Sequence, residues 1–194
     1  MNTQSIINVW DLWVRLFHWS LVIFFFTAYL TEDEFQNIHI YAGYGVSILI
    51  AFRVFWGLIG PKHARFSSFI KGPGETLTYL KGLITGNPVH YIGHNPAGGW
   101  MVVLLLIMLA LTTLAGMSLL AIDGEGPLAG TFIAHFNSDW LEGVHEFAAN
   151  STLCLVAIHV SGVLVSSLLH RENLVRAMFT GKKLLPPSST GDSK

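Results

Sequence analysis

The chain has 194 residues, of which 52% are hydrophobic and only 12% are charged, and its mean hydropathy is +0.52. This composition excludes an ordinary soluble domain and predicts one integral membrane domain. The formal net charge of −1 gives no reason to expect a nucleic-acid partner. The single cysteine, Cys154, excludes an internal disulfide bond and the C-x-x-C-H attachment of a c-type haem.

Four segments are apolar over a length that can cross a bilayer, which takes about 20 helical residues. They lie at residues 12–30, 38–59, 101–122 and 147–169. We therefore predict an all-α fold, an integral membrane four-helix bundle that forms a single domain over residues 1–194. The first apolar segment has no cleavage pattern and is expected to be a retained span. The polar tail at residues 186–194 is expected to be disordered.

Positive charges fall on one side of this bundle when the spans are threaded in alternate directions. All eleven lysines and arginines lie there, whereas the loops on the opposite side carry acidic residues. Lysine-rich and arginine-rich loops are retained in the cytoplasm. The sequence thus predicts a multi-pass protein in the lipid of the bacterial inner membrane, with both termini in the cytoplasm.

The first span begins with an unusual polar pair. Arg15 and His18 are three residues apart and share a helix face, about 10 Å inside the cytoplasmic end of the span. The tryptophans around them, Trp10 and Trp19 among others, are expected at headgroup level. A simpler interpretation is an arginine that extends to the membrane surface and a histidine bonded to a nearby carbonyl.

The second span begins with His39 at the outer end, and Gly43 follows one helical turn later. A missing side chain at Gly43 would let a flat ligand lie close to the helix backbone. Close packing of helices explains this glycine and Gly45 equally well. Arg53 lies one turn before the cytoplasmic exit, where it would reach the surface or pair with a carboxylate.

The connection at residues 60–99 is long and polar. An amphipathic helix is predicted to begin near Pro73 and to lie along the membrane surface. Three histidines of this connection are interpreted as solvated: His63, His90 and His94.

The third span has no ionisable residue and is expected to pack and insulate. A long outer loop is predicted at residues 123–142, with His135 exposed. A loop of that length in a small bundle is usually functional or mobile. His170, at the cytoplasmic end of the fourth span, is expected to be solvated or to relay protons.

The fourth span carries His145 and His159, fourteen positions apart. On an α-helix this spacing advances roughly 21 Å and returns to within about 40° of the same face. A histidine in a membrane span usually faces the bundle interior and marks a functional site. Two imidazoles would therefore point the same way at two depths of the membrane.

Membrane depth decides which histidines can hold one iron together. His39 and His145 lie at the outer ends of their helices, whereas His18 and His159 lie in the cytoplasmic halves. The crossed pairs are excluded because His18 is about 18 Å from the outer end of its helix. Two imidazoles at each of two depths predict two non-covalent haems b between the helices, each with two histidine ligands.

Such sites suit electron transfer. Two imidazoles per iron leave no open position for oxygen, and two irons roughly 20 Å apart would carry electrons across most of a hydrocarbon core about 30 Å thick. The propionates of the inner haem need charged partners, and Arg15 and Arg53 are the cations near it.

The chain resembles the prokaryotic cytochrome b561 family, which includes the cytochrome b subunits of nickel–iron hydrogenases and is similar to those of formate dehydrogenases. The resemblance extends over all four spans. It rests on the run from Trp10 to Trp19, on the His39-x-x-x-Gly43 start of the second span and on the histidine pair of the fourth span. In that family four helices hold two b haems and pass electrons between quinone and a partner or superoxide outside.

By position, the resemblance implies His18 and His159 as ligands of the inner haem. It implies His39 and His145 as ligands of the outer haem.

The leading prediction is an electron-transfer cytochrome that exchanges electrons between the quinone pool and a redox partner, either a periplasmic redox protein or a subunit of a membrane oxidoreductase. The alternative is a free-standing superoxide:quinone oxidoreductase, although an acidic outer face would not attract an anion. A third interpretation is a haem-free metal carrier, but the spans lack the carboxylates expected of hard-cation transport.

The sequence offers two alternative locations for a quinone site. The sequence favours the cytoplasmic side near His63, Arg65 and Tyr79 over a periplasmic site beside Glu146 and Asn150.

Overall fold

A computed structural model describes residues 6–32, 34–86 and 89–184 of the chain. Within these residues, four helices are long and apolar enough to cross a membrane. The predicted all-α membrane bundle is therefore confirmed, while the tail at residues 186–194 lies outside the described residues. The four helices are α1 (Leu12–Leu30), α2 (Gln36–Ile59), α5 (Pro96–Ile122) and α6 (Ser138–His170).

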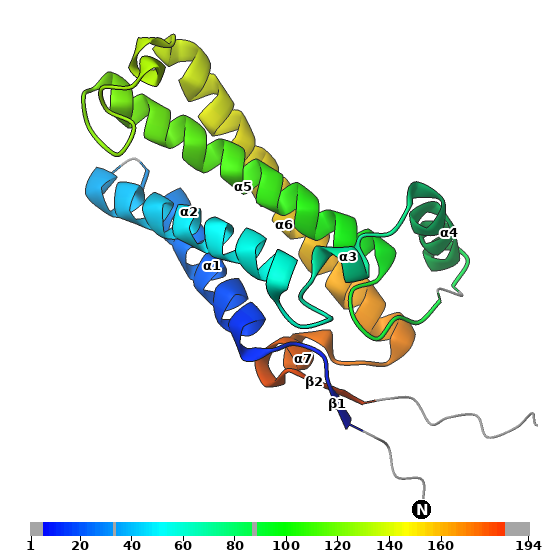
Figure 1. The fold of residues 1–194 in the computed structure, drawn as a ribbon. Coiled ribbons are helices and arrows are strands. Elements are labelled where there is room, and N and C mark those ends of the chain that lie inside the picture. Colours follow the sequence, from blue (N-terminus) through cyan, green and yellow to red (C-terminus); the bar gives the residue numbers. More distant parts are fainter. Residues whose placement is uncertain (1–5, 33, 87–88, 185–194) are drawn as a thin grey trace, which may run out of the picture.

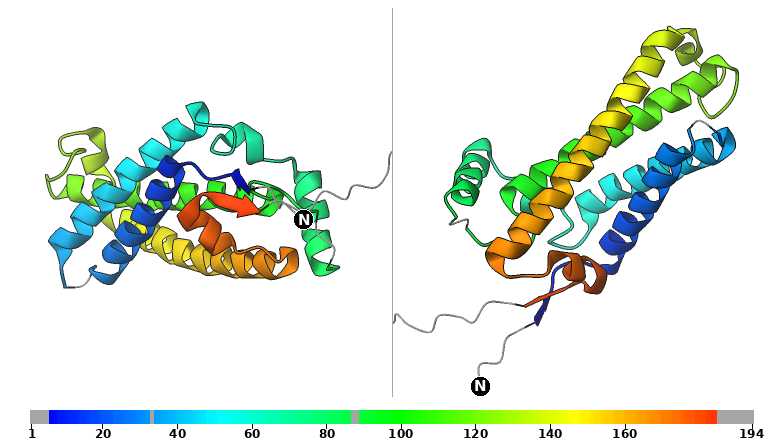
Figure 2. Two further views of the ribbon diagram at one scale, coloured as in Figure 1. Left: turned by 90° about the horizontal axis from the view of Figure 1, so that it is seen from below. Right: turned by 180° about the vertical axis from the view of Figure 1, so that it is seen from behind.

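The long helices form two antiparallel hairpins that lie side by side (Figure 1). Helix α1 packs against α2, α5 packs against α6, and the hairpins meet mainly through α2 and α5. Two further views show that the hairpins cross at an angle (Figure 2). An antiparallel hairpin keeps consecutive apolar helices adjacent through short connections, as in other helical bundles.

Both ends of the described chain meet at one end of the bundle, which we call the base. It comprises the connection at residues 60–95, α7 (Leu174–Thr180) and a small antiparallel sheet of β1 (Ile6–Asn8) and β2 (Lys182–Leu184). The opposite end, which we call the top, carries the turn at residues 31–35 and the loop at residues 123–137. The described chain therefore begins and ends at the end of the bundle opposite to these two connections.

Polar caps place the beginnings of the long helices. Asp11 accepts a hydrogen bond from the backbone N–H of Val14 at 3.1 Å, and Asn95 accepts one from Gly98 at 2.7 Å. Asn137 does the same for α6. These side chains satisfy backbone donors that a first helical turn leaves open.

Two helices begin well before the apolar spans that were predicted within them. Helix α5 begins at residue 96, not 101, and α6 begins at residue 138, not 147. Hydropathy locates the apolar middle of a span, whereas the caps Asn95 and Asn137 decide where the helix begins. Asp139 and Glu142, expected in a loop, thus lie on the first turns of α6. With 33 residues, α6 is about 50 Å long and exceeds the hydrocarbon core.

The interior is small, as expected for a bundle solvated by lipid. Phe25, Val46 and Leu109 form a buried cluster that joins α1, α2 and α5. Large apolar side chains elsewhere on the spans are exposed, including Ile48 at 70% and Leu168 at 78%. Such an outer surface suits contact with acyl chains rather than water.

The predicted surface helix is present as α4 (Pro73–Ile84), preceded by the short α3 (Phe66–Phe69). Its apolar side chains Leu77, Leu80 and Ile84 are exposed, whereas Tyr79 is buried at 2% exposure. The helix therefore binds the bundle through Tyr79 and turns its leucine side outward, as a helix lying on a membrane surface would. In the loop at the top, the 3₁₀ helix η1 (Phe132–His135) leaves His135 exposed, as predicted.

Candidate functional site

The histidines of α2 and α6 meet near the top. The ring centroids of His39 and His145 are 5.9 Å apart, with an angle of 67° between the ring planes. Nδ1 of His39 lies 2.9 Å from the carbonyl oxygen of Ala28, and Nδ1 of His145 lies 2.8 Å from that of Thr112. A carbonyl can only accept, so Nδ1 donates in both rings and Nε2 keeps its lone pair. Both rings are thus oriented as metal-ligating histidines usually are.

A glycine on α5 makes room for one of these rings. A Cβ at Gly116 would lie 3.0 Å from Cε1 and 3.1 Å from Nδ1 of His145. Gly116 is one turn after Thr112, whose carbonyl accepts from that ring. The missing side chain therefore allows His145 to reach across to α5.

We expect Gly116→Ala to reduce haem retention by the pair His39 and His145, because the new methyl group displaces the imidazole by a few tenths of an ångström. The substitution should otherwise favour the helix, since alanine is about 1 kcal/mol better than glycine in a helix interior. Haem content and thermal unfolding of the purified variant test both expectations. Gly143→Ala is the matched control, because nothing lies within 4 Å of a Cβ at Gly143. Equal haem content in the two variants would contradict the role of Gly116.

The two glycines of α2 have different surroundings. A Cβ at Gly45 would meet the ring of Phe24 at 2.8 Å, so this glycine permits the close approach of α1 and α2. A Cβ at Gly43 would meet nothing within 4 Å. Gly43 lies one turn from His39 and on the same helix face. Open space beside His39 fits the predicted approach of a flat ligand at Gly43.

The second pair of histidines lies nearer the base. His18 on α1 and His159 on α6 are close enough to interact electrostatically. The ring of His18 packs edge-on against Trp19 at 5.0 Å, and Trp19 stacks on Phe179 of α7 at 4.3 Å. Helix α7 therefore covers the side of α1 that carries His18.

Buried polar atoms without a partner gather at the base. Among the residues that the structure describes, six such atoms occur, and all belong to residues of the base or of the helix ends beside it. Proteins rarely leave buried donors unsatisfied, and each case calls for an unseen partner or a functional role. The six are Arg15 Nε, His18 Nδ1, Trp19 Nε1, Arg53 Nη1, Tyr79 Oη and His94 Nδ1.

The two arginines of the site differ in environment. Arg53 is only 2% exposed and does not extend to the surface; its guanidinium lies 4.8 Å from the ring centroid of Phe66 and 5.8 Å from that of Phe69. Arg15 is half-buried and donates from Nη1 to the carbonyl of Phe179. Each arginine has a buried nitrogen without a hydrogen-bond partner, Nε in Arg15 and Nη1 in Arg53, so each can still bind an anionic group.

The prediction that His94 is solvated is wrong. Its ring packs between Trp10 and Phe69, with centroid distances of 4.5 Å to each. Burial, and next the charge of Arg53, lower the pKa of His94 to about 3, so the ring is neutral at physiological pH. The residues next to His94 in the sequence are polar and predict a solvent-exposed ring. Tertiary packing instead brings Trp10 of the N-terminal segment and Phe69 of α3 against it.

The other two histidines of the connection are half-buried or exposed. His63 is half-buried, and burial followed by the charges of Lys62 and Lys183 lowers its pKa. His90 is exposed, as predicted, and its Nε2 lies 2.7 Å from a carboxylate oxygen of Glu172. Glu172 also pairs with Lys183 at 3.2 Å, which ties the C-terminal strand to the end of α6.

The donor set fits haem b. The imidazoles of His39 and His145, the helix backbone open at Gly43 and the arginines with unbonded nitrogens match the iron, the flat macrocycle and the propionates of this group. Across the described ranges, His, Cys, Asp and Glu side chains form no group of three or more that could hold a metal ion. The histidines are arranged in twos, as axial haem ligands are.

Four apolar helices that bring histidines together in pairs are the architecture of a membrane-bound b-type cytochrome. The sequence model of the family described as "Prokaryotic cytochrome b561" matches residues 9–181. The chain belongs to this family, which implies haem b as cofactor and electron transport as function.

Three curated relatives are each named "Probable Ni/Fe-hydrogenase B-type cytochrome subunit". The Rhodobacter capsulatus protein is 23% identical over 94% of this chain and 83% of its own length. The Rhizobium leguminosarum bv. viciae protein is 23% identical over 95% of this chain and 91% of its own length. The Bradyrhizobium diazoefficiens protein is 22% identical over 91% of this chain and 85% of its own length. No solved structure matches the chain significantly.

Proposed function

We propose that the chain holds two haems b, one between His39 and His145 and one between His18 and His159, and that it transfers electrons between quinone and a redox partner. The observation that carries this proposal is the approach of His39 and His145 to 5.9 Å, with both Nδ1 atoms bonded to carbonyls. The bound haems supply one-electron iron couples, and two imidazoles per iron favour electron transfer over oxygen chemistry.

The protein residues hold and orient these groups. The carbonyls of Ala28 and Thr112 fix the imidazoles of the top site and raise their basicity as ligands. Gly43 leaves room beside His39. Arg15 and Arg53 are proposed to bind propionates at the base, since both are partly or fully buried and keep a free nitrogen.

We propose that the base faces the cytoplasm of the bacterium. The support is the charge distribution: among the described residues, the lysines and arginines lie at the base or in the helices and connections next to it, and the top carries carboxylates. The even number of span helices and the pairing of β1 with β2 support a location of both described chain ends on that side. The top then faces the periplasm.

The redox partner is proposed to dock at the top. Asp123, Glu125, Asp139 and Glu142 are all exposed there, and such rim charges act mainly on association rate and salt dependence. The names of the relatives, which are those of cytochrome subunits of nickel–iron hydrogenases, support an oxidoreductase subunit or a periplasmic redox protein as partner. The same carboxylates disfavour superoxide, which is an anion.

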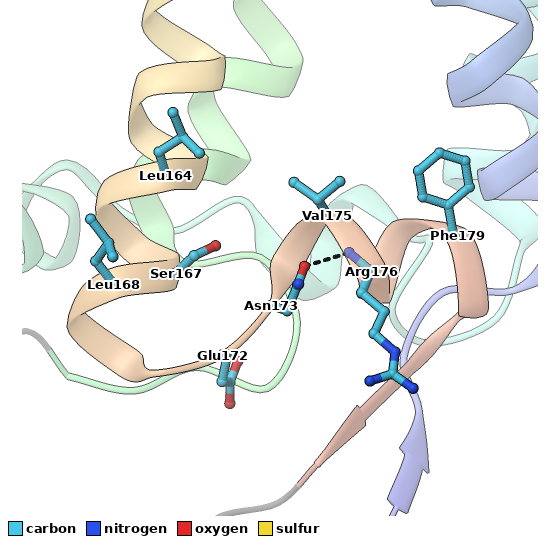
Figure 3. A pocket seen from close by; sticks show the side chains of 8 residues that line it. All are labelled: Leu164, Ser167, Leu168, Glu172, Asn173, Val175, Arg176 and Phe179. Atoms are coloured by element: carbon cyan, nitrogen blue, oxygen red, sulfur yellow. Dashed lines mark hydrogen bonds between the residues drawn. The ribbon is translucent and has the colours of Figure 1, made fainter.

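Quinone is proposed to bind in a groove at the base, between the end of α6 and α7 (Figure 3). The groove has a volume of about 640 Å³. Phe179 on its wall stacks on Trp19, the neighbour of His18, which supports a quinone position near the proposed ligands of the inner haem. Its lining combines apolar side chains that face lipid with a polar rim: Leu164, Ser167, Leu168, Glu172, Asn173, Val175, Arg176 and Phe179.

This location differs from the one favoured by sequence. The groove is not lined by His63, Arg65 or Tyr79. The side chain of Tyr79, on α4, is buried. Of the periplasmic alternative, Asn150 already accepts a hydrogen bond from the Tyr29 hydroxyl at 2.9 Å.

A proton route for quinol oxidation is available at the same end. Glu172 on the rim of the groove bonds His90, and the ring centroid of His90 lies 5.1 Å from that of His170. Imidazole is the side chain best suited to relay protons near neutral pH. His170, predicted as solvated or a proton relay, thus lies in a chain of exchangeable groups.

Quinol-driven haem reduction tests this assignment. We expect Leu164→Trp, which fills the groove, to slow haem reduction by a quinol analogue on the order of tenfold, the effect of losing about 1.4 kcal/mol of binding. Leu169→Trp is the matched control, because Leu169 is exposed on the same helix and does not line the groove. Chemical reduction by dithionite should be unchanged in both.

Three further variants locate the site independently. His170→Ala should slow quinol-driven reduction if protons leave through the base, and His63→Ala should have little effect because His63 does not line the groove. Slowing in Glu146→Gln alone would move the site to the top and overturn the assignment.

A further inference from the structure

His94 occupies a position that packing alone does not explain. It precedes Asn95, the N-cap of α5, and Pro96, which is less than 2% exposed, so the backbone there is fixed. The ring lies between Trp10 and Phe69, and its buried Nδ1 has no hydrogen-bond partner. A phenylalanine would fill this space without leaving a buried polar atom unsatisfied.

Arg53 shares the same surroundings. Its guanidinium faces the ring of Phe69 that also contacts His94, and its Nη1 is unsatisfied. His94 is close enough to interact electrostatically with both Arg53 and His159. Two unsatisfied donors therefore lie near His159: Nη1 of Arg53 on α2 and Nδ1 of His94 in the connection before α5.

No carboxylate of the described chain satisfies these donors. Asp11 is near enough to interact with Arg53 electrostatically, but its oxygens accept from the N–H of Val14 and from the indole of Trp56. A buried guanidinium whose N–H groups no carboxylate accepts is unfavourable, even with a carboxylate near it. The site therefore calls for an external anion with at least two acceptor oxygens.

We propose that His94 and Arg53 together bind a propionate of the haem held by His18 and His159, so that the segment at residues 92–95 lies over that haem. The proposal rests on the proposed haem pairs. His94 acts as a positioning residue: it donates from Nδ1, and Arg53 supplies the charge. Stabilising the propionate charge favours addition of an electron to the nearby iron and raises its reduction potential.

His94→Phe is the decisive variant, because it keeps a ring between Trp10 and Phe69 and removes the donor. We expect the midpoint potential of the base haem to fall, with an approximately tenfold loss in its reduction equilibrium, which equals about 59 mV for a one-electron couple. The potential of the top haem should not change. His94→Gln, which keeps an N–H donor, should recover part of the shift.

Potentiometric titration of the purified protein, followed in the visible spectrum, gives both potentials. Ile92→Phe is the matched control, since Ile92 belongs to the same connection, is exposed and has no proposed role. A base haem that is retained in His94→Phe with an unchanged potential would overturn the inference. Equal shifts of both haems would also overturn it. A wild-type protein without a base haem would instead refute the proposed function, so the two failures are distinguishable.

Discussion

Replacement of His145 by alanine is expected to remove the top haem and about half of the total haem, while leaving the base haem in place. The physical reason is the separation along α6 of His145, which meets His39, from His159, which is proposed to pair with His18. His159→Ala should remove the base haem by the same argument. Haem per protein, measured as the pyridine haemochrome of purified variants, tests both expectations.

The matched control is His135→Ala, since His135 is exposed at the same end of the bundle as His145. It should retain the full haem content. If the single variants at His145 and His159 also keep the wild-type value, the assignment of ligands is wrong. Loss of all haem in both variants would indicate one site rather than two.

Filling the space beside His39 is expected to lower the haem content about as much as His145→Ala does. Gly43→Phe should abolish binding at the top site, because its ring would occupy the volume into which a Cβ at Gly43 points and in which no atom lies within 4 Å. The fold should persist, since no neighbour is displaced. Haem content near one per chain with an unchanged helical circular dichroism spectrum is the expected result.

Gly45→Phe provides the contrast two residues away. A Cβ there already approaches Phe24 to 2.8 Å, so a larger side chain must separate α1 from α2 and lower the unfolding temperature. Overpacking of this kind typically costs about 1–3 kcal/mol. Two haems per chain in Gly43→Phe would show that the open space at Gly43 faces lipid.

Regular periodicity made the spans and the histidine levels predictable. Helical rise and alternate threading suffice to place His39 with His145, and the structure brings these rings within 5.9 Å. The start of α4 at Pro73 followed from a helix-initiating proline and an amphipathic pattern. These features depend on local sequence alone.

Other features depend on contacts between distant segments, so the sequence could not indicate them. The carbonyls that orient His39 and His145 belong to α1 and α5, and every residue type has such a carbonyl. His94 looks polar and solvated in its local context, yet Trp10 and Phe69 enclose it. The groove at the base likewise requires the turn between α6 and α7.

The central claim is that this chain binds two haems b, each between two histidines. Electron paramagnetic resonance of the purified protein, combined with quantified haem per chain, tests it most directly. We expect two haems per chain, both six-coordinate and low-spin, because two imidazoles fill both axial positions. A single haem per chain, or a stoichiometric high-spin signal, would contradict it.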